Sequence, residues 1–454
     1  MINKIFLYIV LLPVFAQAQK SGVLENYVEE GLQNNLSLHQ ESLEIKKSME
    51  SIRQAKALFY PRLSFNPTYS YAAGGRRLNF PVGDLLNPAY KSLNELTGTN
   101  QFPTNIENVN ELLAPTNFHD TKVNVQYSIY NPEVKYNYLI QKSLLSAQEA
   151  KKRVVENELR HNIEAAYYQY LQSLEAVKIL DNSSAILSEL VKLNKKRVAN
   201  NTATKDVVFS SEYEASKLVQ QKIEAENNSR VAGAYFNFLL NRDLGHDILV
   251  DSTLIHTETI NFGGADELAG LKQKARTGRS ELKQIDMSLD AARHAITLQQ
   301  KAASLPALFI GGNAGFQGYG YTFKNQAYMV MQAGLQWDIF KGYERKSKIQ
   351  QAKIQADLLQ TKKTDVEKQI ELQTTQAYYD FVSAGEAQRS FGEGVQNAAQ
   401  YFKVVDSRYR NGNVLLMEYI KAQNDVQTAR LQQVIAKYNV LIKKSILDKI
   451  TVEP

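Results

Sequence analysis

The sequence predicts a mainly helical fold that also carries a small amount of β-structure and is internally duplicated. Three observations predict this fold. No proline or glycine occurs from Glu133 to Ala232, about one hundred residues without the two strongest breakers of secondary structure. Four segments alternate between apolar and polar residues, as half-buried strands do. The order of helices and strands in the first half of the chain recurs in the second half.

The first 18 residues have the pattern of a secretory signal peptide. Asn3 and Lys4 precede an apolar run at 5–15, and Ala16 and Ala18 have the spacing that signal peptidase recognises. The run is shorter than the roughly 20 residues that a helix needs to cross a bilayer. We therefore assign residues 1–18 to a signal peptide, exclude them from the fold and expect an exported protein.

The composition and the motifs argue against several classes of site. The chain has no cysteine, which excludes disulfides, thiolate metal sites and lipid attachment through an N-terminal cysteine. The net charge of +6 is spread along the chain, so nucleic acid is not an expected partner. The histidines lack metal-type spacing, and "GGNAGFQG" at 311–318 precedes a strand rather than the helix of a dinucleotide loop. We expect no catalytic residues, no cofactor and no metal.

The longest predicted helix covers residues 132–199. Asn131 can cap it, Pro132 suits its first position, and Glu133 suits the positive end of the helix dipole. The helix ends at the turn "ANNTATKD", where Thr204 or Asp206 can cap the next helix. At 1.5 Å per residue, this helix extends roughly 100 Å, which is longer than a globular domain requires.

The mature chain consists of two copies of one unit. The segment 166–170 matches 377–381 at an offset of 211, and "QYSIYNPEVKY" from residue 126 matches "QWDIFKGYERK" from residue 336. We assign the first repeat to 19–250, a linker to 251–265 and the second repeat to 266–454. The first repeat is expected to contain strands at about 61–71 and 121–130, a long loop at 73–119, and helices at about 132–199 and 204–242. The second is expected to contain strands at about 306–317 and 328–340, and helices at about 342–410 and 414–448.

The four predicted strands have the length and pattern of strands that cross a membrane. About ten residues suffice for a tilted strand to span a bilayer. The helices begin at the strand ends rather than covering the apolar face, so we expect that face to contact lipid. The expected lipid-facing residues are Leu63, Phe65, Tyr69, Val123, Val125, Tyr127, Leu335 and Trp337. The expected lumen-facing residues are Arg62, Asn66, Lys122, Asn124, Gln126, Asn313 and Gln332. Pro67 lacks an amide proton, which predicts a bulge or an unpaired position in the first strand.

These strands can exist in lipid only as part of a closed barrel. An unpaired backbone amide or carbonyl in hydrocarbon costs several kcal/mol, so open sheet edges are not tolerated there. The smallest outer-membrane barrels have about eight strands. Four strands per chain therefore require several chains, and three copies of four strands would give a barrel of twelve.

Several motifs carry a resemblance to one known family. They are Tyr60-Pro61 and Leu305-Pro306 before the first strand of each repeat, "LQWDIFKGYERKSKIQQAK" from residue 335, and "SRYRNGNVLLMEYIKAQNDV" from residue 407. In this order and within a duplication, they resemble the TolC-type outer-membrane efflux proteins, the outer membrane factors of tripartite export systems. The resemblance implies a homotrimer with a twelve-stranded barrel in the outer membrane, and helices that continue as a tunnel into the periplasm. It also implies two partners, a periplasmic adaptor and an inner-membrane pump.

The same resemblance implies a periplasmic gate at the turn of the second repeat. Tyr409 and Gly412 fit the family pattern, and Glu418 occupies the position of the first inward carboxylate. Lys421 stands where some members have a second acid, and Val414 stands at the usual arginine position, which leaves the charge of the gate open. Three copies of Glu418 would favour cations, and Lys421 would weaken that preference. From the residues alone, Glu418 and Lys421 are better explained as a solvent-facing pair on a helix, and the gate role rests on the resemblance.

Two functions remain open from the sequence. The first is a passive exit duct for efflux or type I protein secretion, with its energy supplied by the pump. The second is a helical structural or surface protein that forms no channel, in which the strands form a small cap. Under the first, the segment 73–119 is expected at the outer mouth of the channel.

Overall fold

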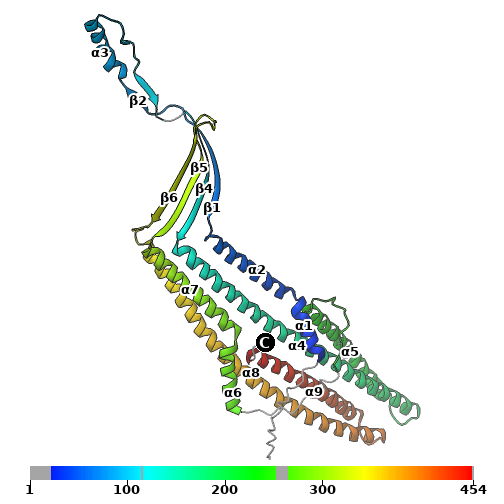
Figure 1. Cartoon of the computed structure of the whole chain (residues 1–454). Helices are drawn as coiled ribbons and strands as arrows, with labels where there is room; N and C mark the ends of the chain where they lie inside the picture. Colours follow the sequence, from blue (N-terminus) through cyan, green and yellow to red (C-terminus); the bar gives the residue numbers. More distant parts are fainter. Residues whose placement is uncertain (1–21, 114–115, 252–263, 452–454) are drawn as a thin grey trace, which may run out of the picture. The chain divides into compact units, whose positions relative to one another are not determined.

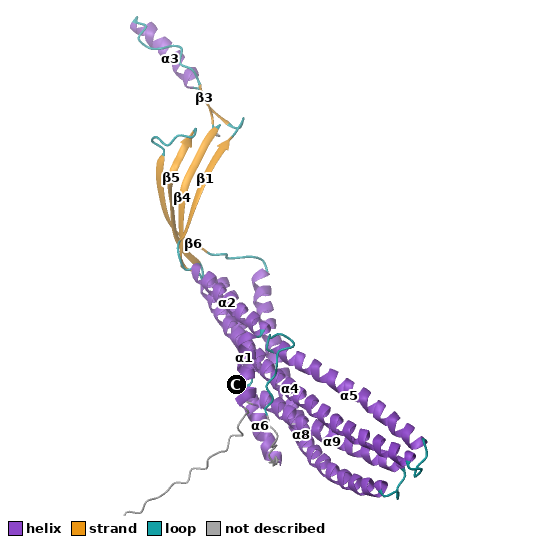
Figure 2. Cartoon of the chain, turned by 90° about the vertical axis from the view of Figure 1, so that its right-hand side faces the viewer, coloured by secondary structure: helices purple, strands orange, loops and turns teal. Residues whose placement is uncertain are grey.

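The computed structural model describes residues 22–113, 116–251 and 264–451 (Figures 1 and 2). The predicted signal peptide and most of the predicted linker lie outside these ranges. The chain divides into two compact units, which we call the helical unit and the sheet unit. The helical unit comprises Met1–Met49, Ser143–Asp290 and Ala356–Pro454, and the sheet unit comprises Glu50–Lys142 and Ala291–Gln355. Each unit therefore contains segments of both sequence repeats.

Apart from β2, α3 and β3, which lie in the first half only, the elements of the described ranges follow one another in the same order in both halves of the chain. The helices are α1 (Gly22–Asn34), α2 (Leu36–Ala57), α3 (Val82–Thr97), α4 (Pro132–Ala199), α5 (Asp206–Leu239), α6 (Gly264–Gly278), α7 (Ser280–Ser304), α8 (Glu344–Arg410) and α9 (Leu416–Thr451). The strands are β1 (Arg62–Tyr71), β2 (Arg77–Phe80), β3 (Val109–Leu112), β4 (Asn117–Tyr130), β5 (Ala307–Tyr319) and β6 (Ala327–Gln336). The duplication pairs β1 with β5, β4 with β6, α4 with α8, and α5 with α9.

The two long helices start differently. Asn131 caps α4, since its side-chain oxygen accepts a hydrogen bond from the amide of Glu133 at 2.9 Å. In the second repeat, Gly342 has a φ of 58°, and the amide of Glu344 bonds to the carbonyl of Lys341 at 3.3 Å. The helices reach 68 residues in α4 and 67 in α8 because α4 has proline only at its first position and α8 has none.

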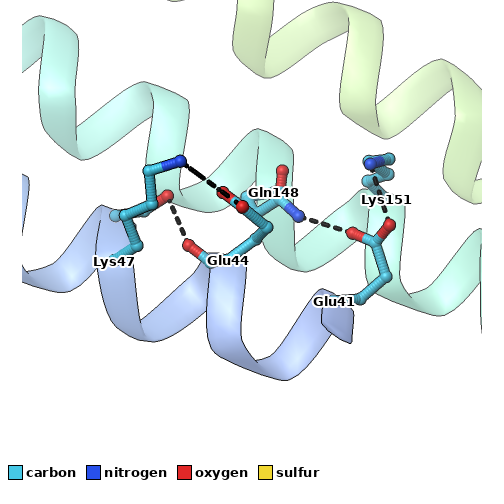
Figure 3. A network of polar contacts seen from close by, with 6 residues as sticks. Glu41, Glu44, Lys47, Gln148 and Lys151 are labelled. Atoms are coloured by element: carbon cyan, nitrogen blue, oxygen red, sulfur yellow. Dashed lines mark hydrogen bonds and ion pairs between the residues drawn. The ribbon is translucent and has the colours of Figure 1, made fainter. Parts of the chain in front are cut away.

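Side chains of α2 contact α4 within the helical unit (Figure 3). The carboxylate of Glu41 accepts a hydrogen bond from Nε2 of Gln148 at 2.6 Å and forms an ion pair with Lys151 at 2.8 Å. One turn further along α2, Glu44 and Lys47 pair on the surface at 3.2 Å. The contacts of Glu41 join helices from distant parts of the sequence, whereas the pair on the surface contributes little to stability.

The helical unit is stabilised by three apolar clusters. One surrounds the fully buried rings of Tyr167 and Phe236, whose centroids are 5.4 Å apart. Tyr167 of this cluster also holds the segment that follows α5, because its hydroxyl donates a hydrogen bond to the carbonyl of Leu249 at 2.8 Å. The second cluster includes Tyr409 and Tyr419, and the third includes Ile370 and Tyr378. Fully burying one such large apolar side chain contributes about 1.5–3 kcal/mol.

The sheet unit contains an antiparallel sheet with the strand order β1-β4-β5-β6. Glycine permits close approach of its strands, since a Cβ on Gly315 would lie 2.1 Å from the backbone oxygen of Thr121. The register shifts once, between Ser128 and Tyr130 of β4. A bulge or an unpaired position was predicted at Pro67; Pro67 lies opposite Thr121 in an uninterrupted register, so the first of these, the bulge, is absent. An edge strand accommodates proline because half of its amides point away from the sheet.

The structure corrects three other local predictions. The segment 73–119 is not a loop throughout, because β2, α3 and β3 lie within it and β4 begins at Asn117. Strand β6 ends at Gln336, so Trp337 lies beyond it. The N-cap of α5 is Lys205, whose side chain forms no capping bond, and Asp206 lies in the first turn instead. Neither Thr204 nor Asp206 therefore occupies the predicted capping position.

Asn35 separates α1 from α2 and fixes the start of α2. Its Oδ1 accepts hydrogen bonds from the amides of Ser37 at 2.9 Å and Leu38 at 3.4 Å, and its Nδ2 donates to the carbonyl of Leu239 at 3.0 Å. One side chain therefore caps a helix and holds it to the end of α5.

We predict that Asn35→Ala lowers the free energy of unfolding by about 1–2 kcal/mol, because the cap and the bond to Leu239 are lost together. Thermal unfolding followed by circular dichroism measures this as a lower midpoint. Asn35→Ser restores a capping oxygen but not the bond to Leu239, so its midpoint should lie between those of Asn35→Ala and the wild type. The neighbouring Asn34 is exposed, and Asn34→Ala serves as the control. Equal midpoints for Asn35→Ala and the wild type would contradict this role.

Candidate functional site

The strand register sorts the side chains of the sheet onto two faces. Residues directly opposite each other in antiparallel strands lie on the same face. Arg62 lies opposite Gln126, which lies opposite Gly311, which in turn lies opposite Gln332. We call the face that carries these residues the polar face. The other, the apolar face, carries Leu63, Val125, Gly312 and Met331 in the same sequence of pairs.

The residues predicted to line a lumen fall on the polar face together. They are Arg62, Asn66, Lys122, Asn124, Gln126, Asn313 and Gln332. The polar face also carries an ion pair between Lys122 and Asp120, and the hydroxyl of Tyr328 donates to Asp120 at 2.7 Å. Three strands thus contribute to one polar cluster. Asp120 and Lys122 lie on β4, and Tyr328 lies on β6. Asn66 lies on β1, opposite Lys122.

The residues predicted to face lipid fall on the apolar face, apart from Trp337, which lies beyond β6. They are Leu63, Phe65, Tyr69, Val123, Val125, Tyr127 and Leu335. This face is uncovered in the single chain, since the side chains of Leu63 and Met331 are 73% and 74% exposed. Apolar side chains at this exposure, side by side on one face, indicate a surface that is covered by another apolar medium or molecule.

An aromatic cluster closes the end of the apolar face nearest the β5–β6 turn. His119 is fully buried there, with ring centroids 5.0 Å from Tyr321 and 5.5 Å from Phe323. Its Nε2 lies 2.6 Å from Oε1 of Gln326 and 2.8 Å from the carbonyl of Thr322. No sequence pattern singles out His119, because its partners lie about two hundred residues away and come together only through the β4–β5 pairing.

The second candidate site is the helical tip, which we define as the ends of α4 and α8 together with the starts of α5 and α9. Both long helices end in the same backbone motif. The amide of Asn413 bonds to the carbonyl of Arg408, and the amide of Thr202 bonds to the carbonyl of Arg197, each at 2.9 Å. The left-handed position of this motif is Gly412 in the second repeat, with a φ of 80°, and an asparagine in the first.

Tyr409 is the centre of the contacts between the two repeats at the helical tip. It is only 3% exposed, and its hydroxyl donates to Oδ1 of the fully buried Asn194 at 2.7 Å. The guanidinium of Arg197 lies 4.8 Å from the centre of the Tyr409 ring and donates to the carbonyls of Tyr409 at 2.7 Å and Arg410 at 2.9 Å. A cation from α4 thus binds the negative end of α8. Burial raises the pKa of Tyr409 above its usual value.

A second set of contacts joins α8 to α9. The ring of Tyr419 lies 5.0 Å from Tyr409 and 5.4 Å from Phe402. Burial, followed by interaction with the carboxylate of Asp406, raises the pKa of Tyr419, so this phenol stays protonated and donates to Asp406 at physiological pH. Asp406 also pairs with Arg410 at 2.9 Å. The tip is therefore a continuous network of buried phenols and paired charges.

The two charged residues predicted for the gate lie outside this network. Glu418 and Lys421 are both exposed on α9. Oε1 of Glu418 accepts a hydrogen bond from the hydroxyl of Tyr401 at 3.3 Å, and no ion pair joins Glu418 to Lys421 in the described chain. The structure thus places Tyr409 in the contacts that hold the tip together, Gly412 in the turn, and Glu418 and Lys421 on the surface.

Neither Asn194 nor Arg197 was predicted from the sequence to be a site residue. A signal for Asn194 was present, because its counterpart at the offset of 211 is Val405, which is buried. A polar residue at a position that is apolar in the other repeat indicates a buried polar contact. Its partner could not be found in this way, since the Tyr409 hydroxyl reaches it only when the two helical hairpins pack together.

Other kinds of site are not found in the described ranges. Within residues 22–113, 116–251 and 264–451, no helix is long and apolar enough to cross a membrane. No group of three or more histidine, aspartate or glutamate side chains in these ranges could hold a metal ion.

Comparisons with known proteins identify the architecture. Residues 271–451 match the profile of the family described as "Outer membrane efflux protein", which confirms the resemblance drawn from the sequence. No curated protein matches the chain. The outer-membrane channel OprN is 13% identical, with a TM-score of 0.76 over 96% of this chain and 91% of its own. The CmeC outer membrane channel of Campylobacter jejuni is 14% identical, with a TM-score of 0.75 over 95% and 85%. The outer membrane protein VceC of Vibrio cholerae is 14% identical, with a TM-score of 0.72 over 94% and 95%. The chain therefore shares the fold of these proteins along nearly its whole length.

We predict that Asn194→Ala destabilises the helical tip by about 1–3 kcal/mol, because it leaves the buried Tyr409 hydroxyl without an acceptor. Hydrogen exchange of the amides at the end of α8 measures this locally as faster exchange. Adding Tyr409→Phe removes the unpaired hydroxyl, so the double variant should exchange more slowly than Asn194→Ala alone. Additive effects of the two changes would show that these side chains are not coupled.

Proposed function

We propose that this chain, whose residues 271–451 belong to the outer membrane efflux protein family, is the outer-membrane channel of a tripartite export system. It conducts substrates passively from a periplasmic adaptor and an inner-membrane pump to the outside of the cell. The observation that carries this function is a four-stranded sheet with one apolar and one polar face, joined in sequence to helices of 68 and 67 residues.

Closure of the sheet is the first step of the proposal. The edges of the sheet are β1 and β6, and in lipid both need a partner strand. When β1 of one copy pairs with β6 of the next, three copies close a barrel of three times four strands. The polar face then lines the lumen with Arg62, Lys122 and Asn124, while Leu63 and Val125 on the apolar face contact lipid.

Unpartnered apolar stripes on the long helices support assembly into a trimer. Along α8, five large side chains recur at helical spacing on one face and are all exposed, namely Leu358, Leu372, Tyr379, Tyr401 and Val404. A similar exposed stripe on α5 contains Phe209, Tyr213, Ile223, Tyr235 and Phe238. Stripes of this length on exposed helices are typical of contacts with neighbouring subunits. In the trimer they join the helices into a tunnel, and at 1.5 Å per residue α4 alone extends roughly 100 Å.

The helical tip is the proposed periplasmic gate. Arg197, Asn194 and Tyr409 tie the tip of the first repeat to that of the second, so the two hairpins cannot separate without breaking these contacts. Glu418 and Lys421 are exposed beside these contacts, where they set the charge at the constriction. Leu415 and Met417, which are 78% and 70% exposed at the start of α9, form the proposed contact with the adaptor.

The trimer is tested by changing the stripe on α8. We predict that Leu358→Ser combined with Leu372→Ser converts the heat-modifiable trimer to monomers on mild-detergent gels, because two apolar subunit contacts are lost. Gln360→Ser lies on the same helix away from the stripe and serves as the control. A wild-type chain that is recovered as a soluble monomer would instead favour the helical structural or surface protein.

The gate is tested in planar bilayers. We predict that Tyr409→Phe combined with Glu418→Ala raises single-channel conductance, since one change removes the bond to Asn194 and the other removes a carboxylate at the constriction. Glu418→Gln alone should reduce the preference for cations. Glu386→Ala, which removes an exposed acid elsewhere on α8, is the matched control. Unchanged conductance and unchanged ion preference would show that this turn is not the gate.

A further inference from the structure

The segment between β1 and β4 forms a small folded insertion, which we call the insertion module (residues 76–113). Its base is the hairpin of β2 and β3, in which Arg77 pairs with Leu112 and Phe80 with Val109. The pairing extends one residue further, since the amide of Leu113 bonds to the carbonyl of Arg76 at 2.9 Å. Helix α3 and a return segment at 98–108 complete the module.

Helix α3 turns its polar side toward its own chain. Asn87 and Asn94 bind the return segment through their side-chain amides. Each side chain donates a hydrogen bond to one backbone carbonyl and accepts one from a backbone amide. Asn87 bonds in this way to Ile106, with both distances 2.8 Å, and Asn94 bonds to Phe102 at 2.8 and 3.0 Å. The return segment also contacts Gly83, where a Cβ would lie 2.0 Å from the oxygen of Ile106.

The opposite side of α3 is apolar and exposed. At 100° per residue, Leu85, Ala89, Leu93 and Leu96 form a stripe on the side of the helix away from Asn87. The side chains of Leu85 and Leu96 are 64% and 83% exposed. An amphipathic helix normally buries its apolar side and exposes its polar side. The inward side of α3 carries the two asparagines beside Tyr90, whose ring lies 5.6 Å from that of Phe102, while the leucine stripe stays outside. This arrangement indicates that another molecule covers the leucine stripe.

The hairpin of the module carries a second exposed apolar surface. Its register places Leu78, Phe80, Val109 and Leu113 on one face, since Leu78 and Phe80 alternate with Arg77 and Asn79 along β2, and Phe80 lies opposite Val109. This face also carries Glu111, which lies opposite Leu78. The four apolar side chains and Glu111 are exposed. The module therefore presents two different apolar surfaces, the leucine stripe on α3 and this hairpin face.

We propose that the insertion modules of neighbouring chains pack against one another, with the leucine stripe of one copy covering the hairpin face of the next. A head-to-tail ring requires two different complementary surfaces on each copy, and the module has two. A single lipid surface or peptide ligand would require only one. The proposal rests on the trimeric channel proposed above, whose closure brings the copies together.

The position of the module in the chain supports a neighbouring copy of the module as the partner that covers the leucine stripe. The module follows β1, the edge strand that pairs with the neighbouring chain when the barrel closes, after a connection of only a few residues. It leaves the sheet at the end opposite to the one where α2 leads into β1 and β4 leads into α4. Tethering to adjacent strands raises the effective concentration of one module near the next to roughly millimolar, so a modest apolar contact suffices. Three modules would then form a closed ring around the outer mouth.

Cysteine cross-linking of the full-length trimer tests the ring, because the chain contains no native cysteine. The variant carries Phe80→Cys and Leu96→Cys, one on each exposed surface, and is treated with a short bismaleimide in detergent micelles. We expect a covalent trimer on denaturing gels. Phe80→Cys with Glu95→Cys is the matched control, because Glu95 is exposed but lies about 100° around the helix from Leu96, and its yield should be at least several-fold lower.

Each other outcome overturns the ring. Intact heat-modifiable trimers without any cross-link between chains would leave the channel in place and reject the contact between modules. A dye on Leu96→Cys that is quenched by brominated lipids, again without a cross-link, would identify lipid as the occupant. Efficient dimer formation by Leu96→Cys alone would indicate stripe-to-stripe pairing, which a head-to-tail ring excludes. A monomeric wild-type chain would reject both the ring and the proposed function.

Discussion

Completion of backbone hydrogen bonds at the edges of the sheet is the constraint on which the rest of the structure depends. Strands β1 and β6 each present one unpaired edge in the single chain. In water these amides and carbonyls would be solvated, but in hydrocarbon each unsatisfied group costs several kcal/mol. In lipid, a sheet with an exposed apolar face and two such edges would therefore need partner strands, which the proposed trimer supplies. The proposed barrel, its lumen and the tunnel all follow from this requirement.

The helical tip follows a different principle, in which buried polar groups determine one arrangement of two hairpins. Asn194 and Arg197 come from the first repeat, and their partner Tyr409 comes from the second. Separating these groups would leave a phenol and an amide without partners, which is unfavourable in an apolar cluster. The exposed Glu418 is not needed for this arrangement. Stability of the tip and charge at its surface therefore depend on different residues, and mutations can change them separately.

Exposed apolar stripes recur in both units of the chain, and the proposed trimer would cover them all. On α5 and α8 they follow the helices, on the sheet they form one face, and on the insertion module they cover α3 and the hairpin. A monomer in water seldom leaves so many large apolar side chains together on its surface. The insertion module differs from the helices and the sheet because the asparagines of α3 bond to backbone groups within the module, while the leucines of α3 face outward. That arrangement is reasonable only in an assembly in which the leucines are covered.

The sequence by itself determined the duplication, the long helices and the two faces of the strands. These features depend on local rules, such as the absence of proline and glycine from Glu133 to Ala232, the cap at Asn131 and the alternation along β1. Local rules also predicted which side chains share a face, because the side-chain period of a strand is two residues.

Only the tertiary structure decided which distant side chains meet. The pairs of Asn194 with Tyr409 and of His119 with Gln326 join residues about two hundred positions apart, and no local pattern encodes their distance. The folded module at 76–113 was likewise missed, because its helix is stabilised by asparagine bonds and one aromatic contact, of Tyr90 with Phe102, to a return segment rather than by a periodic apolar face. Pro67 fits without a bulge because β1 is an edge strand, and strand order is set by pairing between the repeats. Periodicity and capping act within a few residues, whereas these features depend on contacts that exist only after the two repeats have come together.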